Sequence, residues 1–300
     1  MKIKKYDNSK AFRAALEDRL NKISKEEGVD ILRLRRQVSF DRLLARIFSR
    51  HSSPWVLKGG YAMQLRTDNA RATKDVDLAM KEAKLLSTNE DERIESLLEL
   101  LRQEATKDLG DFFAFIIGSS IMEIEAAPYG GARFLVEATV DGRSFEKFHL
   151  DVGIGDVWIE PLEKLKSHDF LSFAGIEAQT FLAIPKEQQF AEKVHAYTFP
   201  RPEGRPNSRV KDLIDMNLLV QNDLNTKLLM IALNETFKRR GSHDLNLTLQ
   251  PPPASWGATY SAMAEECGID REINVGFKTV FDYLKKLVTG QPSPIFYRGE

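Results

Sequence analysis

Residues 57–78 read LKGGYAMQLRTDNARATKDVDL, in which a glycine pair, Gly59 and Gly60, precedes two aspartates one residue apart, Asp75 and Asp77. Side chains alternate faces along a strand, so Asp75 and Asp77 point the same way and together can hold one or two Mg²⁺ ions. A Gly-Gly step between a strand and a helix lets backbone N–H groups approach a phosphate without a Cβ in the way. The stretch therefore predicts a phosphate-binding turn followed by a pair of metal-binding carboxylates.

Each part of this pattern, taken alone, has an ordinary explanation. Asp-x-Asp also occurs on solvated edge strands, and glycine pairs usually mark turns. A third carboxylate, Asp151 in FHLDVGIGD, lies at the end of another alternating segment, and with it the set favours a metal site. Thr73 can contact a phosphate or accept a modification, although β-strand propensity explains it equally well. Lys58 and Arg71 can reach a phosphate or lie on the surface.

Composition limits the classes of protein to consider. The 300 residues are 42% hydrophobic and 29% charged, which is ordinary for a globular chain, and the length favours two domains. Lys and Arg number 43 against 44 Asp and Glu, so a globally basic nucleic-acid binder is excluded, whereas a local basic face is not. A single cysteine, no signal peptide and no long apolar run predict a cytoplasmic protein without a membrane partner.

The distribution of apolar residues predicts an α/β part followed by a helical part. Helical periodicity predicts helices at 9–26, 30–50, 61–66, 92–105, 186–197, 209–220, 223–239 and 274–289. Alternation predicts strands at 55–58, 75–80, 111–118, 132–140 and 145–156, and the segment 176–184, IEAQTFLAI, is strand-like as well. Asp141-Gly142 between the last two runs indicates a hairpin turn. The two expected domains are residues 1–180 and 181–300.

A second group of charged residues lies in KEQQFAEKVHAY (186–197) and RVKDLIDM (209–216). Apolar residues at helical spacing in the first segment should face the core, and Lys193 lies off that stripe. Asp212 and Asp215 stand where the second helix starts, a position that the helix dipole favours for carboxylates without any further role.

A loop rich in arginine connects these two segments. TFPRPEGRPNSR carries Arg201, Arg205 and Arg209, and with the basic run 238–240 it could form a basic rim for RNA or an ordinary solvated surface. His149 and His195 are expected to be structural, because no accompanying Cys or carboxylate cluster suggests zinc.

These blocks in combination resemble one family. The string KGGYAMQLR…RATKDVDL is similar to the signature of the AbiEii/AbiGii-type toxins, the nucleotidyltransferase halves of bacterial toxin–antitoxin and phage-defence pairs. The similarity extends over roughly residues 30–220 and includes GARFLVEATVDGRSFEKFHLDVGIGD as the family's middle strands. The resemblance implies a nucleotidyltransferase (DNA polymerase β-like) fold, with a mixed sheet and a C-terminal helical domain.

The resemblance also implies roles for particular residues. Lys193 would contact the triphosphate of an NTP, and one of Asp212 or Asp215 would support catalysis by orienting Lys193. The expected ligands of Mg²⁺ or Mn²⁺ are Asp75, Asp77 and Asp151, and the expected nucleotide-binding residues are Gly59, Gly60, Thr73 and Lys193.

The expected activity is transfer of a nucleoside monophosphate from NTP to an acceptor, with tRNA favoured among relatives and a cognate antitoxin as regulator. Alternatives are a nucleotidyltransferase acting on a small molecule or a protein, and an inactive nucleotide-binding module. Clustered carboxylates repel one another, so a chain without catalysis has no physical reason to keep them. That argues against the inactive module.

Overall fold

The structure is a computed structural model that describes residues 6–50, 53–80, 89–124, 128–201 and 206–289. Its contacts divide the chain into two compact units. The first contains the described residues up to 66, together with 72–156 and 164–183. The second contains 67–71, 157–163 and the described residues from 184 onward. The division expected at residue 180 differs from this one, because it leaves the short segments 67–71 and 157–163 in the first domain.

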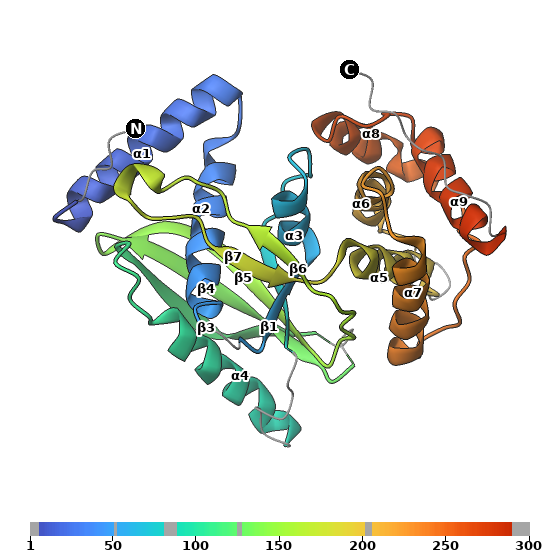
Figure 1. Ribbon diagram of the computed structural model, residues 1–300, viewed down its shortest axis with the longest axis horizontal. Helices are drawn as coiled ribbons and strands as arrows, with labels where there is room; N and C mark the ends of the chain where they lie inside the picture. Colours follow the sequence, from blue (N-terminus) through green and yellow to red (C-terminus); the bar gives the residue numbers. More distant parts are fainter. Residues whose placement is uncertain (1–5, 51–52, 81–88, 125–127, 202–205, 290–300) are drawn as a thin grey trace. The chain divides into compact units, whose positions relative to one another are not determined.

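A mixed sheet forms the centre of the first unit (Figure 1). Its described strands have the order β3-β4-β5-β2-β1-β7-β6. Strand β2 is antiparallel to β1 and parallel to β5, and β4 is antiparallel to both β3 and β5. The strands are β1 (Trp55–Lys58), β2 (Asp75–Met80), β3 (Phe113–Glu123), β4 (Gly131–Val140), β5 (Arg143–Ile154), β6 (Glu163–Lys166) and β7 (Thr180–Ala183).

The hairpin between β4 and β5 forms at the expected turn. Asp141 and Gly142 have φ angles of 55° and 64°, and Val140 pairs with Arg143. Two consecutive positive φ angles are typical of the hairpin turn whose twist matches the flanking strands. On β4 the alternate residues Phe134 and Val136 are fully buried, so one face of the hairpin belongs to the core.

Four α-helices accompany the sheet within the described part of the first unit. They are α1 (Ser9–Glu27), α2 (Ile31–Ile47), α3 (Gly59–Arg66) and α4 (Glu90–Ala105), and a short 3₁₀ turn, η2, spans Ser172–Ala174. Helix α2 packs on β5, α4 on β3, and α3 beside β1 and β2 (Figure 1). The Asp30 side chain accepts a hydrogen bond from the N–H of Leu32, which caps α2.

The second unit is helical. Its helices are α5 (Lys186–Thr198), α6 (Val210–Val220), α7 (Thr226–Arg240), α8 (Gly257–Glu266), α9 (Ile273–Thr289) and the 3₁₀ turn η3 (Ala254–Trp256). Helix α5 packs against α6 and α7, while α6 packs against α8 and α9. The rings of Phe190 and Tyr283, 5.9 Å apart, meet edge to face in this core.

The expected combination of mixed sheet and helical C-terminal part is present. Strand β6 and helix α8 were not expected from the sequence. Among the helices that the structure describes, none is both long and apolar enough to cross a membrane.

Candidate active site

Gly59 lies at the junction of β1 and α3, directly beside the carboxylate of Asp77. Lys58, the last residue of β1, pairs with Asp77 on β2, and α3 begins at the next residue. Gly59 has a φ of +67°, and a Cβ at this position would lie 1.9 Å from Oδ2 of Asp77. Both the backbone conformation and the available space therefore require glycine here.

The three carboxylates expected to bind metal lie on two neighbouring strands. Strand β2 runs parallel to β5, with Asp77 opposite Asp151 and Asp75 opposite His149. Asp75 and Asp77 share one face of the sheet because they are two residues apart, and paired positions on neighbouring strands share a face as well. The backbone thus brings all three aspartates to one face.

Arg133 on β4 contributes a positive charge that the sequence reasoning missed. Its Nε lies 2.7 Å from Oδ1 of Asp151, its Nη2 lies 2.6 Å from Oδ2, and Nη2 is also 4.0 Å from Asp75. The hydrogen bond with Asp151 raises the pKa of Arg133, and the charges of Asp151, Asp75 and Asp77 act in the same direction against burial. The guanidinium is therefore a permanent cation among the carboxylates.

The chemistry of these side chains suits a hard divalent cation, because Mg²⁺ and Mn²⁺ take oxygen ligands. The missing Cβ of Gly59 makes room for the carboxylate of Asp77 itself, whose Oδ2 would lie 1.9 Å from that Cβ. Within the described ranges, no group of three or more His, Cys, Asp or Glu side chains is already arranged to hold a metal ion. Both oxygens of Asp151 are taken by Arg133. Asp75 and Asp77 are the carboxylates that would hold such an ion, and Asp151 would add to them if it were not paired with Arg133.

Two other residues near the glycine pair have defined contacts. The hydroxyl of Thr73 lies against Gly60, where a Cβ would be 2.7 Å from Oγ1, and it donates a hydrogen bond to the carbonyl of Asp75 at 3.4 Å. Lys58 forms an ion pair with Asp156, and its side chain is only 14% exposed. Lys58 therefore connects the end of β1 to the segment after β5.

The two histidines differ from each other. His149 is partly exposed, and its Nδ1 lies 3.3 Å from Oδ1 of Asp75, at the edge of the carboxylate group. His195 is buried in the second unit with its Nε2 2.9 Å from the hydroxyl of Ser242. Burial lowers the pKa of His195 to about 4, helped by the charge of Arg240. His195 is therefore neutral at pH 7.

In the second unit, Lys193 contacts both aspartates that the sequence placed near it. Its Nζ lies 2.6 Å from Oδ2 of Asp215 and 3.1 Å from Oδ1 of Asp212. Burial alone would lower the pKa of Lys193, but Asp215 and Asp212 together outweigh burial and raise it. The Lys193 side chain is 11% exposed. Its ammonium is thus largely shielded from water, and its contacts with the two carboxylates hold it in place.

Arg71 completes this cluster through a contact with Asp215 that the sequence did not predict. Its guanidinium forms two hydrogen bonds of 2.9 Å with the carboxylate of Asp215. Burial would raise the pKa of Asp215, but Lys193 and Arg71 lower it, so the carboxylate stays ionised. Arg209 lies 3.8 Å from Asp212. Three cations thus surround two carboxylates, and the cluster carries an excess of positive charge.

The residues expected to form a basic rim are only partly described. Arg205 lies outside the described residues. Arg201 donates a hydrogen bond to the carbonyl of Ala196 at 3.3 Å, and burial lowers its pKa. The basic run 238–240 forms the last turn of α7, where cations interact favourably with the helix dipole.

Comparison with known proteins adds two findings. One family model matches residues 42–284, and its family is described as the AbiEii nucleotidyl transferase toxin of type IV toxin–antitoxin systems. Among solved structures, the chain is similar to MenT4, a nucleotidyltransferase toxin from Mycobacterium tuberculosis H37Rv. The sequence identity is 14% and the TM-score 0.54, and the match covers 91% of this chain and 99% of MenT4.

A second similar structure is that of JHP933 from Helicobacter pylori. Its identity is 14% and its TM-score 0.43, with 86% of this chain and 95% of that chain covered. A comparison with curated proteins finds no match. The similarity to MenT4 confirms the expected mixed α/β nucleotidyltransferase fold.

Proposed function

The chain belongs to the AbiEii nucleotidyltransferase toxin family, and we propose that it transfers a nucleoside monophosphate from an NTP to RNA, with tRNA as the favoured acceptor. In this reaction an acceptor hydroxyl attacks the α-phosphate and a new P–O bond forms. The bond between the α-phosphate and the β-phosphate breaks, pyrophosphate leaves, and the hydroxyl proton is released.

The observation that carries the proposal is the register of two parallel strands, which aligns Asp77 with Asp151 and puts Asp75 on the same face. We assign metal binding to these three carboxylates. Mg²⁺ or Mn²⁺, when bound there, neutralises charge on the triphosphate. Arg133 holds the Asp151 carboxylate in place, and Asp151 would either help to hold the ion or accept the proton of the attacking hydroxyl.

The triphosphate is assigned to two sets of residues. Gly59 and Gly60 open α3, so their N–H groups are at the positive end of a helix, where anions bind favourably. Thr73 lies against Gly60 and offers its hydroxyl. Lys193 is assigned a contact with the β- or γ-phosphate, and Asp212 and Asp215 act by orienting its ammonium. The excess positive charge of that cluster favours an anionic ligand.

An RNA acceptor agrees with the charge of the chain, which is close to neutral overall but locally basic at the end of α7. RNA binding through such a confined face should be modest and sensitive to salt. We further propose that the reaction takes place in the cytoplasm, that a cognate antitoxin restrains it, and that it serves phage defence. The family's place in toxin–antitoxin systems supports the antitoxin as partner.

The proposal is tested by incubating the purified protein with each of the four NTPs labelled at the α-phosphate, Mg²⁺ and total cellular RNA. Label should appear in the tRNA band and should be absent with Asp77→Asn. Asp18→Asn, which changes an exposed aspartate on α1, is the control and should label normally. Label on protein or a small molecule alone would overturn the RNA acceptor. No label on any fraction would contradict the proposed transfer.

A further inference from the structure

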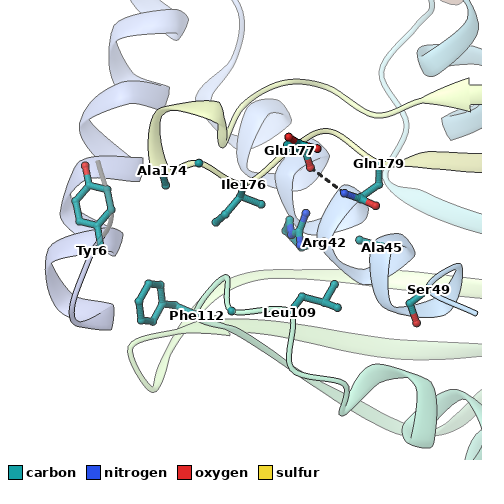
Figure 2. A pocket seen from close by; sticks show the side chains of 12 residues that line it. Tyr6, Arg42, Ala45, Ser49, Leu109, Phe112, Ala174, Ile176, Glu177 and Gln179 are labelled. Atoms are coloured by element: carbon teal, nitrogen blue, oxygen red, sulfur yellow. Dashed lines mark hydrogen bonds between the residues drawn. The ribbon is translucent and has the colours of Figure 1, made fainter. Parts of the chain in front are cut away.

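A pocket of about 630 Å³ lies within the first unit, away from the three aspartates (Figure 2). Its walls come from α2, from the segment 109–112 before β3, and from the segment 174–179 before β7. The two segments face each other across the pocket with Arg42 between them. None of these residues has a role in the proposed transfer reaction.

Arg42, which lines this pocket, shares one buried carboxylate with Arg46. Asp111 is fully buried, and it accepts a hydrogen bond of 2.6 Å from Nε of Arg42 and bonds of 2.9 and 2.6 Å from Arg46. The side chains of Arg42 and Arg46 are 7% and 1% exposed. Two buried cations therefore face a single anion, which leaves one positive charge without a counter-ion in this group. Burying such a charge is costly unless an anion compensates it.

The uncompensated charge is on the side of Arg42 that faces the pocket. Arg46 also donates to the carbonyl of Phe113 at 2.8 Å and lies over the ring of Phe115, so both of its terminal nitrogens are already used. Arg42 uses only Nε for Asp111. In the part of the chain that the structure describes, neither of its terminal nitrogens has a hydrogen-bond partner. These two nitrogens form one edge of a planar fork, whose geometry matches two oxygens of a carboxylate or phosphate.

The other charged groups at the pocket do not neutralise Arg42. Glu177 lines the pocket but is exposed, so water screens its charge. Ser49, at the opposite wall, accepts a hydrogen bond of 2.9 Å from Lys107. Lys107 and Arg50 are paired with Glu104, so they form a separate ion-pair group.

The remaining walls combine polar and apolar groups, and the apolar side chains define the rest of the ligand. Leu109, Phe112 and Ile176 line the pocket near Arg42, and Tyr6 closes one end. A volume of this size is typical of small-molecule sites, which combine apolar walls with a few placed polar groups.

We propose that this pocket binds an organic anion, whose carboxylate or phosphate group accepts hydrogen bonds from the free edge of Arg42 while its apolar body lies among Leu109, Phe112 and Ile176. The site is independent of the carboxylates assigned to nucleotidyl transfer. The test of this binding site is therefore independent of the test of the proposed function.

The proposal is tested by titrating the full-length protein with benzoate, phenyl phosphate and benzyl alcohol, using calorimetry or ligand-detected NMR. One or both anions should bind saturably, and which of them binds more tightly separates carboxylate from phosphate. Arg42→Gln should weaken that binding by about tenfold or more, because a charged bidentate contact is lost. Arg50→Gln, an exposed arginine outside the pocket, is the matched control and should bind as the wild type.

Arg42→Gln should fold, since Asp111 keeps both hydrogen bonds from Arg46. If circular dichroism shows that it does not, Ala174→Trp provides the test, because it fills the pocket without touching the ion pairs and should also abolish binding. The proposal is overturned if neither anion binds the wild type, if benzyl alcohol binds as tightly as the anions, or if a folded pocket variant binds them unchanged.

Discussion

Replacing Gly59 with alanine should remove transfer activity from a protein that still folds. At a φ of +67° an L-residue costs about 1–2 kcal/mol relative to its preferred conformations. The added Cβ would lie 1.9 Å from Oδ2 of Asp77, whereas ordinary van der Waals contact begins at 3.4 Å. The carboxylate must then move by about 1.5 Å, and a misplacement of about 1 Å can lower catalysis about 100-fold. We expect kcat/KM to fall by at least about that factor.

Gly28→Ala is the matched control. Gly28 has a φ of +69°, but nothing lies within 4 Å of a Cβ built on it, so this variant bears the same backbone cost without any contact. Urea unfolding should show losses of similar size for both variants, while transfer of label from NTP should fall only in Gly59→Ala. Equal transfer rates for the two variants would refute the argument that Gly59 protects the position of Asp77.

Three further predictions concern charged residues. Arg133→Met should lower the free energy of unfolding by about 1–2 kcal/mol in EDTA, because a charged hydrogen-bonded partner of Asp151 is lost. Added Mg²⁺, which binds the native state, should reduce this difference in stability between the variant and the wild type. Thermal unfolding with and without Mg²⁺ measures the difference. A difference that Mg²⁺ leaves unchanged would count against a metal at this site. Lys193→Met should lower kcat/KM for NTP, whereas Lys211→Met, at an exposed position on the same unit, should not. Equal effects of the two would remove Lys193 from the nucleotide. The pKa of His195 is about 4 in the native state, against an ordinary value of 6.5. Between pH 4 and 6.5, the imidazole is therefore protonated in the unfolded chain and neutral in the native protein. Stability should therefore be complete above pH 6.5 and decrease as the pH falls toward 4. Urea unfolding at several pH values should show this slope, and His195→Gln should flatten it; a slope that persists in the variant belongs to other groups.

Local signals in the sequence were enough to locate most elements. Gly28 ends α1 at a φ of 69°, and Asp30 caps α2, so the break between the two helices follows from two residues alone. The apolar pattern does not predict helix α8, because its sequence, GATYSAMAEE, is rich in small residues. Its two buried side chains, Tyr260 and Ala264, form a narrow apolar stripe.

Arg133 shows why one contact of the site could not be foreseen. A regular hairpin with its turn at Asp141-Gly142 pairs Arg133 with Leu150, a buried residue. The irregularity between Ala138 and Thr139 shifts the register by one, which puts Arg133 opposite Asp151. A shift of one residue exchanges the two faces of a strand, and the residues around the irregularity give no clear sign of it.

The alignment of Asp77 with Asp151 was beyond local reasoning for another reason. Strands β2 and β5 are parallel and are separated by α4, β3 and β4, so no turn determines their register. Only the resemblance to a family suggested that Asp151 acts together with Asp75 and Asp77. Likewise, the bond between Arg71 and Asp215 joins residues 144 positions apart, and nothing in either segment predicts it.

The central claim, nucleotidyl transfer at the aspartates of β2 and β5, is tested most directly by comparing ATP labelled at the α-phosphate with ATP labelled at the γ-phosphate, or the corresponding pair for the NTP that the protein prefers. With Mg²⁺ and tRNA, the account predicts that α-label enters RNA, that γ-label is recovered only in pyrophosphate, and that both signals disappear in Asp77→Asn. Transfer of γ-label to RNA, or α-label transfer that survives Asp77→Asn, would contradict it.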